Sequence, residues 1–159
     1  MRTGVAIQDF LAQKRIAVVG VSKDPADFSR YVFRELERRH YDVVPVNRLG
    51  GTLEGRPCYA RVQDIWPPVD GALLMTPPLA TDEVVKDCAQ AGVSRVWMHR
   101  GVGGTGAVSE TAAAFCRQQG INVVAGACPL MFLRRPGFPH NLHGSLLKLC
   151  HRHPEQRPV

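Results

Sequence analysis

The sequence lacks several patterns that would place it in a class at once. No apolar run approaches the roughly 18 residues of a membrane-spanning helix. The five cysteines are odd in number, widely spaced and without a Cys-x-x-Cys pair, which argues against a disulfide scaffold. The stretch from Val5 to Leu11 contains Asp9 and has none of the apolar core and cleavage site of a signal peptide. We therefore expect a reduced, cytoplasmic protein without membrane contact.

Catalytic and metal-binding signatures are also missing. There is no Gly-x-Ser-x-Gly elbow and no motif of paired carboxylates. The histidines near the end of the chain fit no strong zinc spacing, even when Cys150 is added to them. The composition does not predict nucleic-acid binding either. The net charge of +6 favours anionic partners in general, but no stacking-aromatic motif accompanies it.

What the sequence does contain is a regular alternation of apolar segments, in a chain of 159 residues that is 45% hydrophobic. Five short, almost continuous apolar runs predict strands over residues 16–21, 43–46, 69–75, 95–98 and 121–125. Apolar residues at helical spacing predict helices over residues 5–14, 28–40, 81–91 and 108–119, with one further turn over 62–65. Ser29 is expected to cap the second helix, and residues 50–59 are expected to form a loop.

This alternation predicts an α/β protein. Strands that are apolar on both faces are typical of a parallel sheet covered by helices on both sides. We therefore expect a Rossmann-like, doubly wound sheet of about five strands in three layers. The sequence predicts one domain over residues 1–133. A C-terminal extension over 134–159, rich in Arg, Pro, Gly and His, is expected to contain a short helix over 142–150 and a frayed tail.

The first two strand ends carry the residues with the clearest chemistry, since ligands bind beyond the carboxyl ends of strands in such sheets. The first strand leads into Gly20, Val21, Ser22 and Lys23, and Ser29 and Arg30 follow at a helix start. Backbone amides, hydroxyls, cationic side chains and a helix N-terminus together predict an anion cradle. The alternative is a polar surface loop with one tight-turn glycine. The second strand ends in Val46, Asn47 and Arg48.

The remaining strand ends complete the predicted site. Thr76, Pro77 and Pro78 follow the third strand, where the prolines form a wall without amide donors or simply start the next helix. The fourth strand is followed by His99 and Gly101, and the fifth by Cys128 and Pro129.

A dinucleotide site of the usual kind is not expected at these positions. Such a site has three glycines in its first loop and a carboxylate after the second strand, for the ribose hydroxyls. Here the loop has one glycine, and Arg48 occupies the region of the carboxylate. An arginine suits a phosphate on the ribose, which leaves NADP and other phosphorylated nucleotides open.

The strand ends taken together resemble a known family. The matching segments occur in the order typical of bacterial and archaeal CoA-binding domain proteins, which are relatives of the CoA-binding domain of succinyl-CoA synthetase α subunits. These segments are Gly20-Val21-Ser22, Pro45-Val46-Asn47, Gly55 before Tyr59, Val96-Trp97-Met98 with Gly101-Val102, and Cys128-Pro129. The resemblance covers residues 12–133.

The resemblance implies coenzyme A as the ligand. It implies that Gly20, Ser22 and Lys23 hold the CoA phosphates, and that residues 46–48 meet the adenosine phosphate region. It places residues 76–78 along the ligand and residues 128–129 near the site. Arg48 then suits the 3′-phosphate of CoA. The chain departs from the family pattern at His99, at Gly103-Gly104 and in the apolar segment after Pro129.

The function expected from these observations is binding of CoA or an acyl-CoA without catalysis. The synthetases phosphorylate a histidine on a second domain, and only about 25 residues follow the resemblance here. His99 is interpreted as a loop residue and Cys128 as a buried, inert thiol. Two alternatives remain: an NADP-linked or CoA-thioester-using enzyme, and an acyl-CoA-sensing module that acts through its C-terminal segment. A homo-oligomer is compatible with the sequence.

Overall fold

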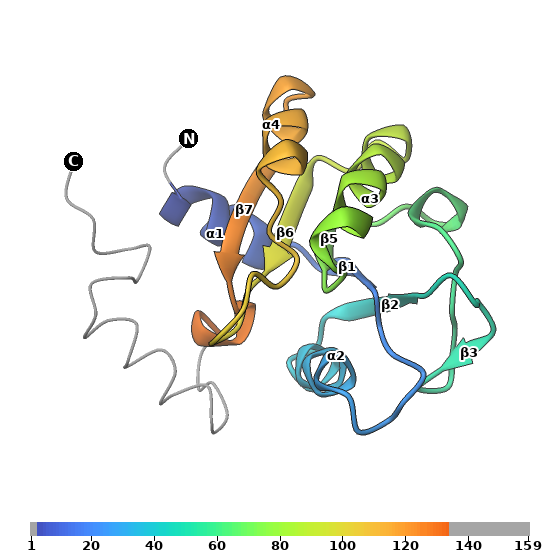
Figure 1. Ribbon diagram of the computed structural model, residues 1–159. Helices are drawn as coiled ribbons and strands as arrows, with labels where there is room; N and C mark the ends of the chain where they lie inside the picture. The colour runs from blue at the N-terminus through green and yellow to red at the C-terminus, as the bar shows by residue number, and fades with distance from the viewer. Residues whose placement is uncertain (1–2, 134–159) are drawn as a thin grey trace.

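The structure is a computed structural model that describes residues 3–133 (Figure 1). The predicted extension over 134–159, with its short helix and tail, lies outside the described residues. The centre of the fold is a parallel sheet of five strands in the order β2-β1-β5-β6-β7. The strands are β1 (Arg15–Val19), β2 (Asp42–Val46), β5 (Gly71–Leu74), β6 (Arg95–His99) and β7 (Asn122–Ala127). The predicted α/β class and the five strands are confirmed.

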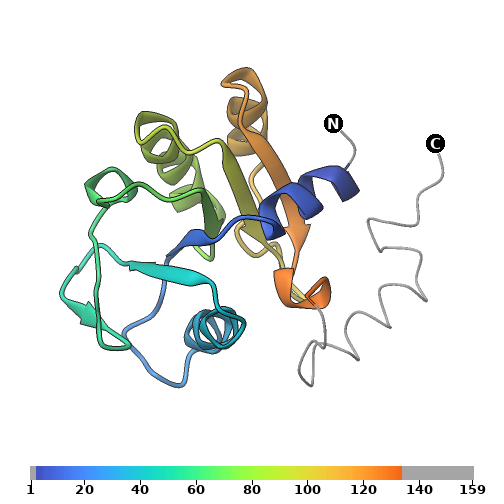
Figure 2. The ribbon, with the colours of Figure 1, turned by 180° about the vertical axis from the view of Figure 1, so that it is seen from behind.

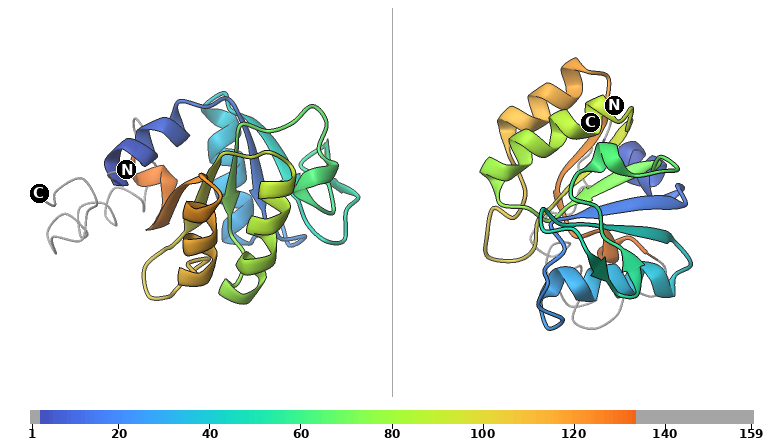
Figure 3. Two further views of the ribbon diagram at one scale, coloured as in Figure 1. Left: turned by 90° about the horizontal axis from the view of Figure 1, so that it is seen from above. Right: turned by 90° about the vertical axis from the view of Figure 1, so that its right-hand side faces the viewer.

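Helices cover both faces of this sheet, as the views from above and from the side show (Figure 3). Helices α1 (Thr3–Leu11) and α2 (Phe28–Arg38) lie on one face, and α3 (Pro78–Gln90) and α4 (Glu110–Gln118) lie on the other. In β1, Ile16 and Val18 pack toward α1 and α2, while Ala17 and Val19 pack toward α3 and α4. Alternate residues of one strand thus enter two separate cores, which explains the continuous apolar run.

The strand order sets where the polar loops meet. The chain crosses from β1 to β2 on one side of β1, and the later strands are added on the other side, from β5 outward. In doubly wound sheets of this order, the loops after the two strands at the reversal diverge and leave a crevice at the carboxyl edge. Here those are the loops that follow β1 and β5.

Three helix starts and one cap differ from the expectation. Helix α1 begins at Thr3, two residues early, and α4 at Glu110, two residues late. Helix α2 has Asp27 as its N-cap, whose carboxylate accepts a hydrogen bond from the amide of Ser29, so the predicted Ser29 cap is wrong. Helix α3 begins at Pro78, three residues before the expected start. A proline fits the first turn of a helix because its missing N–H is not needed there. The predicted turn over residues 62–65 is observed as the short helix η1 (Val62–Asp64).

The expected loop over residues 50–59 contains a small hairpin, formed by β3 (Thr52–Leu53) and β4 (Arg56–Pro57). Glu54 and Gly55 make the turn, with φ angles of 51° and 71°. Two consecutive positive φ angles are typical of the tight turn that suits a twisted hairpin. Figure 2 shows the hairpin from behind, beside the edge of the sheet that β2 forms.

Candidate functional site

The loop after β1 starts between the ends of two neighbouring strands. The amides of Gly20 and Val21 donate to the carbonyl oxygen of Val46, at 2.9 and 3.3 Å. On the other side, a Cβ atom on Gly20 would lie 3.0 Å from the carbonyl carbon and oxygen of Met75 and from Cγ2 of Thr76. Gly20 also has a φ of 90°. Only glycine combines this backbone angle with so close an approach to the end of β5.

The first turn of α2 is tied to the same loop. The amide of Ser22 donates to Oγ of Ser29 at 2.9 Å, and this hydroxyl in turn donates to the carboxylate of Asp27. The amide of Ser29 donates to that carboxylate at 2.8 Å. Ser29 therefore links the helix to the loop, and the carboxylate of Asp27 occupies part of the helix N-terminus that the sequence suggested for an anion.

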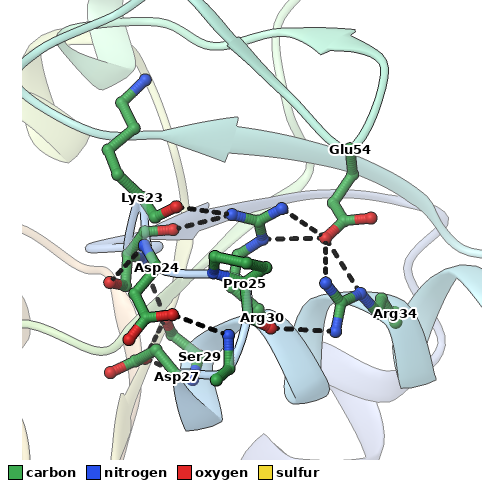
Figure 4. A network of polar contacts seen from close by, with 10 residues as sticks. Lys23, Asp24, Pro25, Asp27, Ser29, Arg30, Arg34 and Glu54 are labelled. Carbon is green, nitrogen blue, oxygen red and sulfur yellow. Dashed lines mark hydrogen bonds and ion pairs between the residues drawn. The ribbon is translucent and has the colours of Figure 1, made fainter.

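The hairpin reaches the loop through three charged side chains, which Figure 4 shows. Arg30 is almost buried, and its guanidinium contacts Glu54 on one side and the carbonyl oxygens of Ser22 and Lys23 on the other. Arg34 pairs with the same carboxylate. These hydrogen bonds from Arg34 and Arg30 hold the pKa of Glu54 below its ordinary value of 4.5, against the opposing effect of burial.

The end of β2 also contacts the loop. Nδ2 of Asn47 donates to the carbonyl oxygen of Val21 at 2.8 Å, while its Oδ1 accepts from the amide of Leu49 at 2.9 Å. Nζ of Lys23 donates to the carbonyl oxygen of Gly50. Arg48 is exposed, and it makes no hydrogen bond or ion pair within the part of the chain that the structure describes. Its guanidinium is therefore the cation at this strand end that a ligand can reach without displacing an internal contact.

The loop after β5 lies against Gly20 of the loop after β1. Oγ1 of Thr76 lies 2.8 Å from Oγ1 of Thr81, which is fully buried in the first turns of α3. Pro77 is the N-cap residue of α3 and Pro78 its first residue. Neither proline has an amide N–H, so this side offers a rigid wall with few donors.

The far end of the site is apolar. The buried ring of His99 lies 5.6 Å from the ring of Phe28, the first residue of α2. Gly101 follows closely, since a Cβ atom there would lie 3.6 Å from Cε1 of His99. Burial raises the pKa of the Cys128 thiol to about 11, against weaker opposing hydrogen bonds from backbone amides. Cys128 is therefore a neutral thiol at pH 7.

The apolar residues after Pro129 have a structural role. They form the short helix η2 (Pro129–Met131), in which Leu130 is fully buried. The ring of Phe132 lies 5.8 Å from the ring of Trp97. This segment therefore belongs to the core on the face of the sheet that α1 and α2 cover.

Some negative findings hold for residues 3–133. No helix there combines the length and apolar character that a membrane crossing requires. No group of three His, Cys, Asp or Glu side chains in the same range gathers closely enough to hold a metal ion.

The fold and these loops define a doubly wound α/β protein whose polar loops gather at one edge of the sheet. Comparison with known proteins then identifies the family. The family model described as CoA binding domain matches residues 14–134, and the chain belongs to this family.

Individual relatives agree with this assignment. The chain is 32% identical over 88 residues to the α subunit of an ADP-forming acetate–CoA ligase II from Pyrococcus furiosus, and 25% identical over 80 residues to an ADP-forming acetate–CoA ligase from Methanocaldococcus jannaschii. These matches cover 55% and 50% of this chain, but only 19% and 11% of the ligases. A solved structure of a hypothetical protein from Pyrococcus horikoshii superposes with a TM-score of 0.72 at 27% identity, over 81% of this chain and 87% of that one.

The sequence-predicted residues fall into two groups in space. Residues 20–23, 29–30 and 46–48 form one interlocked unit, and residues 76–78 lie against it through Gly20. His99, which was expected in a loop, is the buried last residue of β6. Residue 101 follows β6, and residues 128 and 129 follow β7, further along the same edge. Sequence reasoning missed Glu54, which lies in a turn 24 residues after Arg30 with no local motif to mark it. It also missed Asp27, although an acidic residue just before a helix is a recognised cap signal.

Proposed function

We propose that the protein binds coenzyme A, or an acyl-CoA, at the carboxyl edge of its sheet and performs no chemistry of its own. The observation that carries the proposal is the match of residues 14–134 to the CoA binding domain family. The CoA-dependent names of the two ligases support the same ligand. The binding unit would comprise residues 1–133, in keeping with the earlier domain prediction.

The arrangement of donors suggests how the ligand would lie. The diphosphate would bind at the loop of residues 20–23, and the ribose phosphate would bind near Arg48, whose side chain is exposed at the end of β2. The proline wall of residues 77–78 would flank the ligand. The pantetheine arm would run toward His99, Gly101 and Cys128, where the surroundings are apolar. A thiol with a pKa of about 11 is a poor nucleophile at pH 7, which favours binding over chemistry at Cys128.

The first test is direct. Titration calorimetry of the purified protein with CoA should give saturable heat, and mass spectrometry after denaturation should find CoA that was carried through purification. Thermal shifts with NADP and with CoA compare the two phosphorylated nucleotides. A larger shift with NADP, or no binding of CoA at millimolar concentration, would refute the proposal. Turnover of a CoA thioester by the protein would refute the second half of it.

The second test concerns Arg48. If its guanidinium contacts the 3′-phosphate, 3′-dephospho-CoA should bind more weakly than CoA, by about 1.5 kcal/mol, the lower end for a charged hydrogen bond at an exposed position. The Arg48→Ala variant should bind both ligands with similar affinity. Arg117→Ala is the control: it removes an exposed arginine of α4, a helix that packs against α3 and β7. This variant should preserve the difference in affinity between CoA and 3′-dephospho-CoA. An Arg48→Ala variant that still discriminates between the two ligands would place the 3′-phosphate elsewhere.

A further inference from the structure

We propose that Glu54 is a positioning residue for the phosphate loop, defined here as residues 20–25. Glu54 lies on the hairpin and does not need to touch the ligand. It would act by fixing two arginines of α2, which in turn hold the carbonyl groups of the loop. This inference rests on the proposed binding of CoA and adds a residue to which the family assignment gives no role.

The contacts form a chain from the hairpin to the loop (Figure 4). One carboxylate oxygen of Glu54 accepts from both guanidinium groups: Nε of Arg30 at 2.8 Å and Nε of Arg34 at 2.9 Å, with the Nη2 atoms at 2.6 and 2.7 Å. From Arg30, Nη1 continues to the carbonyl oxygens of Ser22 and Lys23, both at 3.2 Å. Nη1 of Arg34 donates to the carbonyl oxygen of Pro25 at 3.1 Å. Three carbonyl groups of the loop are therefore held by guanidinium groups that Glu54 orients.

This pattern decides which way the loop presents its donors. In a trans peptide the C=O and N–H groups point in opposite directions. Carbonyl groups that face Arg30 thus direct the following amides away from it. The amide of Asp24 donates to Oγ of Ser22 at 3.1 Å, whereas the amide of Lys23 makes no hydrogen bond among the described residues. A loop that turns its carbonyls inward presents an outward amide to an anion, and here that amide is the one of Lys23. Without Glu54, Arg30 would lose the contact that fixes its orientation, and the loop carbonyls would lose their anchor.

The backbone of Glu54 provides an independent observation. Its φ angle is 51°, in the left-handed region that glycine, asparagine and aspartate adopt most readily. A glutamate there is an unfavourable choice for the turn itself. From this position its carboxylate lies 2.6 and 2.7 Å from Nη2 of Arg30 and of Arg34. Arg30 is a demanding partner, because its side chain is only 10% exposed and a buried guanidinium needs a counter-charge.

The sign of the effect separates positioning from simple charge. Glu54 is negative and lies near the proposed site of an anion, so electrostatics alone predicts that Glu54→Gln tightens binding. A positioning role predicts the reverse, because the loop loses its order although the site gains positive charge. The chain offers a matched control in Glu37, which also joins α2 to the hairpin. Its Oε1 accepts from Nε of Arg56 at 2.6 Å, and it has no contact with the phosphate loop among the described residues.

The experiment compares Glu54→Gln and Glu37→Gln by calorimetry with CoA, and by amide hydrogen exchange of the ligand-free proteins. We expect Glu54→Gln to weaken CoA binding by about tenfold or more, the lower range for losing a charge-assisted contact. We expect Glu37→Gln to bind within about twofold of the wild type, or more tightly. Exchange over residues 20–27 should accelerate in the Glu54 variant only. Equal or tighter binding by Glu54→Gln, or unchanged exchange in the loop, would overturn the proposal.

Two further measurements keep the outcome decisive. Arg30→Lys keeps the charge, but its single nitrogen cannot span the distance between Glu54 and the two carbonyl groups, which different nitrogens of Arg30 contact. The variant should therefore weaken CoA binding. Combining it with Glu54→Gln should weaken binding little further. It also decides the question if Glu54→Gln does not fold, and unchanged affinity in Arg30→Lys would contradict the proposal. If the wild-type protein fails to bind CoA, the proposed function is wrong, while the exchange of the ligand-free loop still decides whether Glu54 orders it.

Discussion

Gly20 shows how much of the site depends on a single missing side chain. The loop after β1 must turn sharply and pass directly beside the backbone of β5, and Gly20 is the residue at that point. Its φ of 90° and the 3.0 Å approach of a Cβ atom to Met75 are separate obstacles to any substitution. The loop is therefore placed by the absence of a side chain, as well as by the hydrogen bonds that later residues make.

Gly20→Ala should lower the free energy of unfolding by more than the roughly 1–2 kcal/mol that a left-handed backbone alone costs an alanine, because the contact with Met75 adds to it. Gly92 has a φ of 72° and nothing within 4 Å of a Cβ atom, so Gly92→Ala isolates the backbone cost. Urea denaturation of both variants measures the difference. If both variants lose the same free energy of unfolding, the close approach of Gly20 to β5 does not contribute to the effect.

The sequence was informative at Gly20 and uninformative at Glu54. A glycine directly after an apolar strand predicts a tight turn because the chemistry is local. The role of Glu54 depends on α2 and a hairpin turn coming together, which no spacing in the sequence encodes. Likewise, the sequence marks Arg30 as a cation near a helix start, but only the structure shows that its guanidinium faces loop carbonyls and a carboxylate.

At the scale of elements, the start of α2 is where local and distant contacts meet. The carboxylate of Asp27 caps the helix by accepting hydrogen bonds from the amide and the hydroxyl of Ser29. The oxygen of that hydroxyl in turn accepts a hydrogen bond from the amide of Ser22. The sequence predicted the helix and the five strands because apolar periodicity reports burial directly. It missed the hairpin of β3 and β4 because strands of two residues are too short to show alternation. The start of α3 at Pro78 was named only as an alternative, because apolar periodicity becomes visible only from residue 81.

Asp27→Ala should lower the free energy of unfolding by about 1 kcal/mol, within the range measured for the loss of an N-cap side chain. Asp27→Asn should cost much less, because an amide oxygen can still accept from Ser29. Ser109, which caps α4 and accepts from the amide of Ala112 at 3.2 Å, is the matched position away from the loop. We expect Ser109→Ala to resemble Asp27→Ala in chemical denaturation. An asparagine variant as unstable as the alanine variant would contradict the capping role.

At the scale of the whole molecule, Asp9 joins the N-terminal helix to the far side of the sheet. Its carboxylate accepts from Nδ2 of Asn122 in β7 and from Nε of Arg95 in β6, both at 2.9 Å. These contacts lower the pKa of Asp9 from 3.8, with the bond from Asn122 the largest cause. The three-layer architecture itself was predictable from alternating apolar segments, but this contact spans most of the chain and was not.

The pH dependence of stability follows from that shift. A carboxyl group with a lower pKa in the folded state stabilises the protein at pH values above about 4, and this contribution disappears as the pH falls further. Asp9→Asn should therefore be less stable than the wild type at pH 7, by about 1 kcal/mol. The gap between the two proteins should be narrower at pH 3 than at pH 7, because protonation of the carboxyl group removes the contribution. Denaturant titrations at both pH values measure this, and a gap that stays constant with pH would show that the charge of Asp9 is not what stabilises the contact.

The two outer strands of the sheet, β2 and β7, influence whether the protein aggregates at high concentration. An unpaired strand edge can add a strand from another molecule and begin aggregation. On β2, Pro45 has no N–H to offer, and its carbonyl oxygen already accepts from the amide of Tyr59 at 3.0 Å. On β7, the register with β6 shifts near Gly126, whose φ is 92°, so the edge is irregular there. Both ends of the sheet are thus shaped against growth into a larger one.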